Sequence, residues 1–238
     1  MSRVVGNMDQ PGKNASIARD TPQAIIDGVL SVMAKEGIAN LTTKLVSKRA
    51  GVSTASIHYF FDTKDALIYQ AFLYMVRTLR EETIAIRRTE PDPLKRIARS
   101  LEVHFSPFHF MADISIIWPQ FWAYSGADKS VARLMHIFSS RMISNSTADL
   151  RELGFSRAAA RMKAIELSAL QRGLWIERRL ALSVRQEECW RILETALAAI
   201  AKETGRTAPK FNAKTNAMDR PDSSTGSQQK AADHDQSK

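Results

Sequence analysis

The chain has 238 residues, of which 44% are apolar and 25% are charged, so it can bury a sizeable hydrophobic core. No stretch approaches the roughly 20 consecutive apolar residues of a membrane-spanning helix, and the polar N-terminus lacks the apolar region of a secretory signal. We therefore expect a globular, cytoplasmic protein without a membrane partner.

Lys and Arg together number 34 against 25 Asp and Glu, which leaves a formal net charge of +9. This sign suits a polyanionic partner such as nucleic acid, but the excess is spread along the chain and does not by itself locate a binding surface. The single cysteine, Cys189, excludes a disulfide framework and a multi-cysteine zinc site. We expect neither a metal nor a cofactor.

Residues 1–20 are polar without periodicity, which predicts a flexible arm. Thr21 and Pro22 are a typical helix start, and Gly37 ends the helix that they open. Another helix begins at Thr42 or Thr43, and Asp62 opens a sequence that resembles a capping box for the next. The remaining periodic segments follow at 94–105, 109–125, 128–153, 156–180 and 184–204.

No segment alternates as a strand does, so the sequence predicts an all-α fold with about nine helices. The segment 205–238 has too few large apolar residues to offset its ordering entropy, and we expect it to be disordered.

The most informative segment is Thr43–Phe60, TKLVSKRAGVSTASIHYF, which fits a helix-turn-helix. Gly51 supplies the positive φ that the turn needs, Ser47 supplies a small residue for the close crossing, and Ser53 can cap the second helix. Five apolar side chains are expected to face inward: Val46, Ala50, Val52, Ile57 and Phe60. The small or hydrogen-bonding side chains left on the outer side can reach DNA: Thr54, Ala55, Ser56, His58 and Tyr59.

The longer segment AGVSTASIHYFFDTKDALIYQAF resembles the signature of the tetracycline-repressor (TetR/AcrR) family. This resemblance implies a DNA-binding transcriptional regulator with an N-terminal helix-turn-helix domain over residues 21–64. Thr43, Tyr59 and Lys64 fall on positions that usually contact phosphate in the family. Thr54, Ser56 and His58 fall where the family reads bases.

The C-terminal part is similar to the choline-responsive repressors of glycine betaine synthesis, through WPQFWAYSGADKSVARLMHI and SALQRGLWIERRL. This likeness implies that residues 65–204 form a helical ligand-binding and dimerisation domain with choline as effector. One position departs from the subgroup, because Arg172 precedes Gly173 where the subgroup has an acidic residue.

Aromatic faces attract quaternary ammonium groups, and Trp118, Phe121 and Trp122 share one helical face. With Tyr124 and Trp175 they are the candidate ligand-binding aromatics, although they can equally be plain core residues. Asp113, Glu166 and Glu177 are candidate partners for a cation. Arg172 shares a helical face with Trp175, and if it points into the pocket it opposes a cation and favours an anionic ligand.

The last two long helices, 156–180 and 184–204, carry apolar stripes that predict a four-helix bundle between two subunits. The residues expected at this interface are Ile165, Ala169, Leu170, Ile192, Ala196 and Ala199. A two-fold dimer predicts an inverted-repeat operator on double-stranded DNA.

Three alternatives stay open: a regulator answering an anionic or apolar ligand, a DNA-binding protein without a ligand, and a small-molecule enzyme. The sequence contains no P-loop, dinucleotide-binding fingerprint, nucleophile elbow or His-Glu-x-x-His motif, so nothing in it supports an enzyme.

Overall fold

The computed structural model describes residues 13–105, 116–181 and 184–211. These ranges contain nine α-helices, one short 3₁₀ helix and no strand, so the prediction of an all-α fold is confirmed. In chain order the elements are α1 (Lys13–Glu36), η1 (Ile38–Asn40), α2 (Thr43–Ala50), α3 (Thr54–Phe60), α4 (Lys64–Thr89), α5 (Pro93–His104), α8 (Ile117–Tyr124), α9 (Lys129–Glu152), α10 (Arg157–Ala181) and α11 (Gln186–Glu203).

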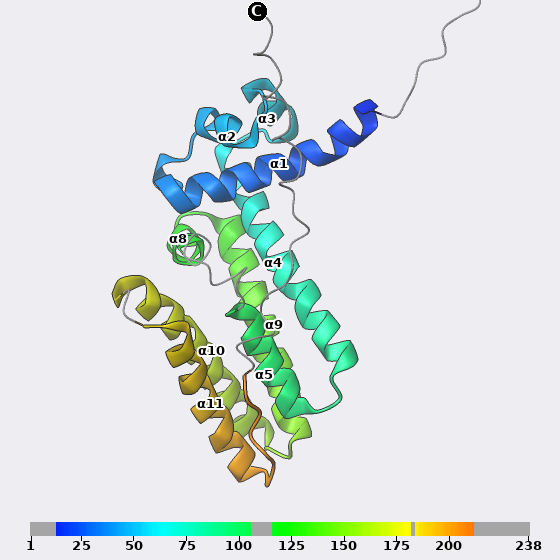
Figure 1. The fold of residues 1–238 in the computed structure, drawn as a ribbon, viewed down its shortest axis with the longest axis vertical. Coiled ribbons are helices and arrows are strands. Elements are labelled where there is room, and N and C mark those ends of the chain that lie inside the picture. The colour runs from blue at the N-terminus through cyan, green and yellow to red at the C-terminus, as the bar shows by residue number, and fades with distance from the viewer. Residues whose placement is uncertain (1–12, 106–115, 182–183, 212–238) are drawn as a thin grey trace, which may run out of the picture.

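The molecule is elongated, with α1, α2 and α3 grouped at one end and α10 and α11 at the other (Figure 1). The long helix α4 starts in the first group and runs along the body beside α5 and α9. The short helix α8 lies between the two ends, next to α1. Helices α4 and α8 therefore both connect α1 to the rest of the molecule.

The first helix begins at Lys13, eight residues before the predicted start at Thr21. The first part of the predicted arm is therefore helical, and Pro22 lies inside α1 instead of at its first position. Residues 13–20, KNASIARD, contain good helix formers without an apolar stripe, and sequence periodicity cannot detect such a helix. Residues 1–12 of the predicted arm lie outside the described residues.

The start of α4 also differs from the prediction. Its N-cap is Thr63, whose hydroxyl oxygen accepts a hydrogen bond from the backbone N–H of Ala66 at 3.0 Å. Asp62 therefore does not cap the helix. Asp65 does not close a capping box either, because its carboxylate accepts a hydrogen bond from the Tyr124 hydroxyl on α8.

One continuous hydrophobic core joins the two ends of the molecule. Helix α4 buries an apolar stripe in this core, and Phe72 lies near the middle of the stripe. The Phe72 ring is 5.6 Å from the ring of Trp118 and 4.5 Å from that of Phe121, both on α8. Helix α8 therefore packs against α4 through these three rings.

A buried ion network joins α4, α5 and α9. Asp149 is almost fully buried, and its two carboxylate oxygens accept from Arg96 Nε at 2.8 Å and Arg87 Nη1 at 2.7 Å. Arg96 also pairs with Glu152. Burial lowers the pKa of Arg96, but its hydrogen bonds to Asp149 and Glu152 outweigh burial and raise it overall. A buried charge in such a network is stable only while its partners remain.

The chain after α11 is ordered as far as Phe211, so the prediction of disorder from residue 205 is wrong for 205–211. Arg206 pairs with Asp92 at 2.8 Å, and the backbone N–H of Phe211 donates to Glu194 at 2.9 Å. The Phe211 ring lies 4.8 Å from the ring of Trp190. The side chain of Phe211 thus holds this segment in place because it packs on the ring of Trp190. The rest of the predicted tail, 212–238, lies outside the described residues.

Candidate functional site

The first candidate site is the helix-turn-helix of α2 and α3. Gly51 ends α2 in the left-handed conformation with φ 68°, as the turn requires. Thr42 caps α2, and Ser53 caps α3 by accepting a hydrogen bond from the backbone N–H of Ser56 at 3.0 Å. Ile57 is buried and anchors α3 to the core. The Gly51 turn, the Ser53 cap and the start of α2 agree with the sequence prediction.

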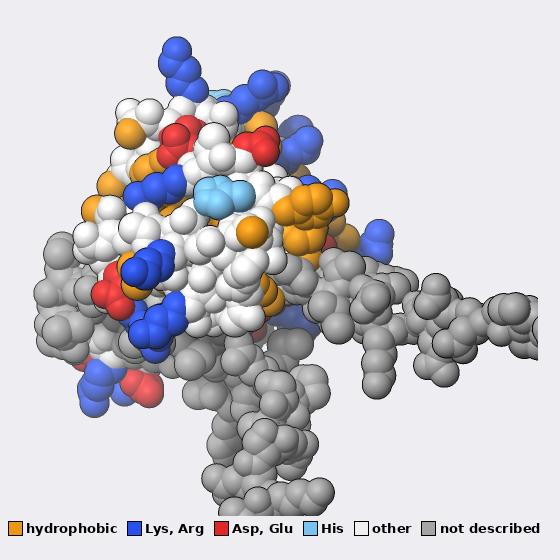
Figure 2. Space-filling model, turned by 90° about the horizontal axis from the view of Figure 1, so that it is seen from above, with side chains coloured by type: hydrophobic (Ala, Val, Ile, Leu, Met, Phe, Trp, Pro, Cys, Tyr) orange, Lys and Arg blue, Asp and Glu red, His pale blue; other side chains and the backbone are white. Residues whose placement is uncertain are grey.

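Helix α3 presents its other side to solvent at one end of the molecule. Thr54, Ala55 and His58 are exposed, and Tyr59 is 82% exposed. Ser56 is half-buried, and its hydroxyl lies 2.9 Å from that of Ser53. Figure 2 shows this end of the molecule, where several Lys and Arg side chains, with some Asp and Glu among them, lie around a surface of mostly uncharged groups. The face therefore combines small hydrogen-bonding groups with basic side chains nearby.

The prediction that Phe60 faces inward is wrong. Its side chain is 38% exposed and meets the Tyr59 ring edge to face at 4.9 Å. Phe61, one turn after Ile57, packs against the core in its place. The two phenylalanines are adjacent in sequence, and only the end of α3 at Phe60 decides which of them turns inward.

The phosphate-contact candidates lie at helix starts. Lys64 is exposed at the first position of α4, where its Nζ donates weakly to the carbonyl oxygen of Ala39 at 3.4 Å. Thr43 is half-buried at the first position of α2. Lys44 and Lys48 on α2 are also exposed, and sequence reasoning missed them. Their four-residue spacing on one helix was the available signal.

Gly28 on α1 is a further residue that the sequence analysis missed. A Cβ at this position would lie 3.0 Å from Ala50 Cβ and 3.2 Å from the carbonyl oxygen of Val46, both on α2. Helix α1 therefore crosses α2 closely at Gly28, in addition to the crossing of α2 with α3 for which Ser47 was predicted. A glycine inside an amphipathic helix is the signal that could have indicated it.

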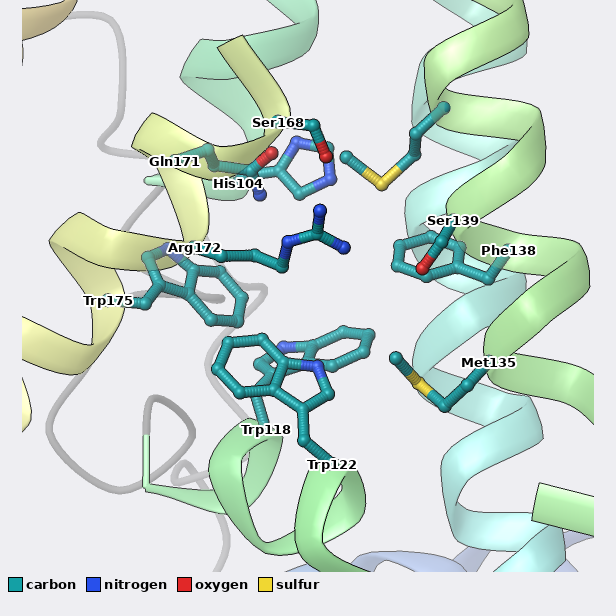
Figure 3. A pocket seen from close by; sticks show the side chains of 11 residues that line it. His104, Trp118, Trp122, Met135, Phe138, Ser139, Ser168, Gln171, Arg172 and Trp175 are labelled. Carbon is teal, nitrogen blue, oxygen red and sulfur yellow. The ribbon is translucent and has the colours of Figure 1, made fainter. Parts of the chain in front are cut away.

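The second candidate site is a pocket between α5, α8, α9 and α10 (Figure 3). Its walls come from two helical stripes with the same spacing. Helix α9 contributes Met135, Phe138, Ser139 and Met142, and α10 contributes Ser168, Gln171, Arg172 and Trp175. Trp118 and Trp122 on α8 and His104 on α5 complete the lining. The cavity has a volume of about 20 Å³, enough for a single water molecule.

Tryptophan rings form one wall of the pocket. The Trp175 ring lies 5.5 Å from that of Trp118 and 6.3 Å from that of Trp122, to which it is inclined by only 27°. On the other side, Phe138 stacks on Trp118 at 5.6 Å. Such faces bind apolar groups and attract methylated ammonium groups.

Arg172 points into this pocket. Figure 3 shows its guanidinium between the tryptophans and the side chains of Phe138 and Ser139. Within the described residues, the Arg172 side chain makes no hydrogen bond and no ion pair. No Asp or Glu is among the residues that line the pocket. Glu166 and Glu177, two of the carboxylates expected to face a cation, are exposed, and Asp113 lies outside the described residues.

Three buried polar atoms around the pocket have no hydrogen-bond partner within the described residues. They are the indole N–H groups of Trp118 and Trp175 and the amide oxygen of Gln171. All three side chains are at least 96% buried, since Gln171, the most exposed of them, has 4% of its surface accessible. Leaving such a group unpaired costs about 1–3 kcal/mol, so the closed pocket holds unused hydrogen-bonding capacity.

Two of the predicted ligand-binding aromatics lie outside the lining. Phe121 is buried against Phe72 instead. Tyr124, two residues after Trp122, faces the start of α4 instead, where burial and the hydrogen bond to Asp65 raise its pKa far above the usual range. Trp118 and Trp122 share a helix face with Phe121, but that face is divided between the pocket and α4.

The predicted dimer residues divide by exposure. Ala169, Ala199 and Ile192 are exposed on α10 and α11, whereas Ile165, Leu170 and Ala196 are half-buried. Leu170 and Ala196 pack against the core of their own chain. Met162 and Ile176 on α10 are additional large apolar side chains left exposed.

Comparisons with known proteins match both parts of this architecture. Residues 25–71 match the model of bacterial regulatory proteins of the tetR family. Residues 93–202 match that of the C-terminal domain of BetI-type transcriptional repressors. The HTH-type transcriptional regulator BetI of Paraburkholderia xenovorans is 31% identical over 153 residues, which cover 64% of this chain and 78% of that protein. The chain belongs to the tetR family.

The family resemblance inferred from the sequence is therefore confirmed, and the protein is a DNA-binding transcriptional regulator with a BetI-type C-terminal domain. A BetI regulator of Burkholderia ambifaria is 30% identical over 158 residues, covering 66% of this chain and 81% of that protein.

Solved structures share the fold at low sequence identity. A transcriptional regulator from Rhodococcus has a TM-score of 0.69 at 19% identity, covering 77% of this chain and 97% of that one. A regulator from Saccharomonospora viridis, solved in complex with choline, has a TM-score of 0.66 at 22% identity, covering 77% of this chain and 96% of that one. Among the described helices of this family member, none is long and apolar enough to cross a membrane.

Proposed function

We propose that this protein is a homodimeric repressor, released from an inverted-repeat operator by a small effector. The proposal assigns it no catalytic activity and a cytoplasmic location. The observation that carries it is the exposed face of α3, held rigidly by the Gly51 turn, the Ser53 cap and buried Ile57. A helix presented in this way fits the major groove of DNA.

In this proposal α3 carries the DNA contacts. Thr54, Ser56 and His58 read base edges, and Ala55 and Ser53 approach the DNA at the start of the helix. Thr43, Tyr59 and Lys64 hold the phosphate backbone, which sets the register of the protein on the duplex.

The dimer forms through α10 and α11. The exposed apolar side chains of Ile192, Ile176 and Met162 support this interface, because an unpartnered apolar face on two neighbouring helices favours association. The two-fold axis then sets two α3 helices in successive major grooves, about one turn of DNA apart.

The effector enters the pocket that Trp118, Trp122, Trp175 and Arg172 line. Helix α8 connects this pocket to the DNA-binding end through Gln120, which lies in sequence between Trp118 and Trp122. The Gln120 side chain accepts from the backbone N–H of Ile38 at 2.6 Å and donates to the carbonyl oxygen of Met33 at 3.0 Å. A ligand that moves α8 therefore pulls directly on α1 and η1, and it releases the operator by as much as it prefers the moved state.

Choline is the candidate effector that the relatives favour. The tryptophan faces suit its trimethylammonium group, and the S. viridis regulator of the same fold was solved with choline. Arg172 inside the pocket, without a lining carboxylate, opposes this candidate.

The proposal is tested by selecting genomic fragments on the purified protein and footprinting the site obtained. The expected result is a sequence with two-fold symmetry, bound by two subunits, with half-sites about one helical turn apart. Binding to fragments without a shared symmetric sequence would contradict it.

A further inference from the structure

We propose that the pocket receives a small organic carboxylate, whose anionic group pairs with Arg172 and whose compact body lies against the tryptophans. This inference rests on the proposed function only in that it takes this pocket for the effector site. It assigns the effector a negative charge, which the choline candidate lacks.

The guanidinium of Arg172 is the first observation. It lies inside the pocket, and no carboxylate of the described residues pairs with it there (Figure 3). Guanidinium groups bind carboxylates with two parallel hydrogen bonds, and they are always charged in proteins. A half-buried positive charge beside aromatic rings is best matched by an anion that enters with the ligand.

The buried indole N–H groups of Trp118 and Trp175 are a second, independent observation. Both are donors, and neither has a hydrogen-bond partner within the described residues. Together with the guanidinium, they give the pocket three donor groups beside the tryptophan faces; its other polar lining groups are the hydroxyls of Ser139 and Ser168, the amide of Gln171 and the imidazole of His104. A ligand carboxylate, which only accepts hydrogen bonds, complements such a set.

The tryptophan faces then limit the rest of the ligand. They suit either a methylated ammonium group or a branched apolar group of the same shape. A zwitterion with a trimethylammonium group and a purely apolar carboxylate are therefore two sources of the same carboxylate chemistry. A simple cation such as choline would instead bring a second positive charge beside Arg172.

The cavity of about 20 Å³ cannot hold such a ligand without movement of its walls. Trp118 and Trp122 are carried by α8, the helix that Gln120 joins to α1. A carboxylate that enters between Arg172 and the tryptophans must therefore displace either the Arg172 side chain or α8. Binding is thus coupled to the contact that reaches the DNA-binding end.

Four compounds of nearly identical shape separate the effect of a negative carboxylate from that of a positive ammonium group. Glycine betaine and choline both carry a trimethylammonium group and differ in having a carboxylate or a hydroxyl group. The corresponding pair with a tert-butyl group is 3,3-dimethylbutanoate and 3,3-dimethylbutan-1-ol. Binding is measured on the full chain by calorimetry and by tryptophan fluorescence, since three of its four tryptophans line the pocket.

We expect each carboxylate to bind at least about tenfold more tightly than the alcohol with the same trimethylammonium or tert-butyl group. Arg172→Gln should abolish this difference, and Arg172→Lys should retain part of it. The matched control is Arg161→Gln, which removes an exposed arginine from the same helix outside the pocket and should leave all four affinities unchanged. If glycine betaine binds more tightly than 3,3-dimethylbutanoate, the ligand is a trimethylammonium zwitterion. If the reverse holds, it is an apolar carboxylate.

The inference is overturned if choline binds as tightly as glycine betaine, if Arg172→Gln leaves the carboxylates unaffected, or if neither carboxylate binds at millimolar concentration. Operator binding without any compound is measured on the same samples. A protein that binds its operator but no carboxylate refutes this inference alone, whereas one that binds no symmetric operator refutes the proposed function.

Discussion

At the residue scale, the DNA-binding end depends on side chains whose backbone or steric demands are strict. Gly51 must adopt positive φ, and Ser53 must offer an oxygen to the start of α3. Lys64 is the opposite case: its side chain is exposed, and its one contact within the described residues is a weak hydrogen bond, which leaves its charge available to phosphate.

Lys64→Ala should weaken operator binding by a similar factor for every DNA sequence. It should also lower the slope of log affinity against log salt concentration by about 1 per subunit, because one phosphate contact is lost. Binding titrations at several salt concentrations measure both effects, and Lys129→Ala, an exposed lysine on α9, is the control. A loss confined to one operator sequence would mean that Lys64 reads bases instead.

Gly28→Ala should destabilise the protein although alanine is the better helix former. The new methyl group would contact Ala50 Cβ at 3.0 Å and the backbone of Val46 at 3.2 Å, so α1 and α2 must separate. We expect a loss of about 1–3 kcal/mol in the free energy of unfolding, measured by urea denaturation. Gly28→Val should cost more, and a stabilised Gly28→Ala variant would disprove the tight crossing.

At the element scale, single polar contacts fix how a helix meets its neighbours across the shared core. Helix α8 is the clearest case, since Gln120 joins it to α1 and η1, and Tyr124 joins it to Asp65 at the start of α4. Helix α5 is similarly defined by its N-cap, Asp92.

Gln120→Ala should uncouple the effector pocket from the DNA. We expect the effector to bind with little change in affinity, while the loss of operator affinity that it causes becomes several-fold smaller. The two affinities are measured separately, by calorimetry and by operator titration. If release by the effector is as strong as in the parent protein, α8 transmits its movement by another contact.

Asp92 should make stability depend on acid pH. Burial raises the pKa of Asp92, but hydrogen bonds from the backbone N–H groups of Lys95 and Leu94 and the charge of Arg206 lower it overall. Because the folded pKa lies below the unfolded value of about 3.8, the stabilisation is complete above that pH and is lost as pH falls through the folded pKa.

Asp92→Asn keeps an N-cap and removes the charge. It should lower the free energy of unfolding by about 0.5–1 kcal/mol at neutral pH and by less at pH near 3. Urea denaturation at both pH values tests this difference. An equal loss at both would show that the charge of Asp92 does not contribute.

At the scale of the whole molecule, the proposed function requires two subunits at a set distance. The exposed side chains of Ile192 and Ala199 belong to the outer faces of the last helices, while Leu170 and Ala196 are partly used by the core of their own chain. A charge at either of the latter two would disturb the monomer as well as the dimer.

Ile192→Glu is therefore the cleaner test of the dimer. Its side chain is 41% exposed, so the monomer should stay folded while a charge in the interface costs several kcal/mol and the dimer dissociates. Light scattering measures the mass, and operator binding should be lost with the dimer. Ile137→Glu, at a 47% exposed isoleucine on α9, is the matched control and should remain dimeric.

The sequence alone determined the helical class, the helix-turn-helix with its Gly51 turn and Ser53 cap, and the family. These features depend on local spacing and on the backbone preferences of single residues, so they can be predicted without knowing what packs against them. Three other features could not be predicted in this way: the inward turn of Phe61 in place of Phe60, the helical Lys13–Asp20 segment and the contact of Phe211 with Trp190.

The pocket was decided only by the tertiary structure. The stripes of α9 and α10 are ordinary amphipathic patterns, and nothing in either one shows which residues of the other it will face. Arg172 shares a helical face with Trp175 whatever the fold, but only the packing of α8 and α9 against α10 turns that face into an enclosed pocket. Under the proposal made above, the charge of Arg172 acts on a ligand only because α5, α8 and α9 pack around it.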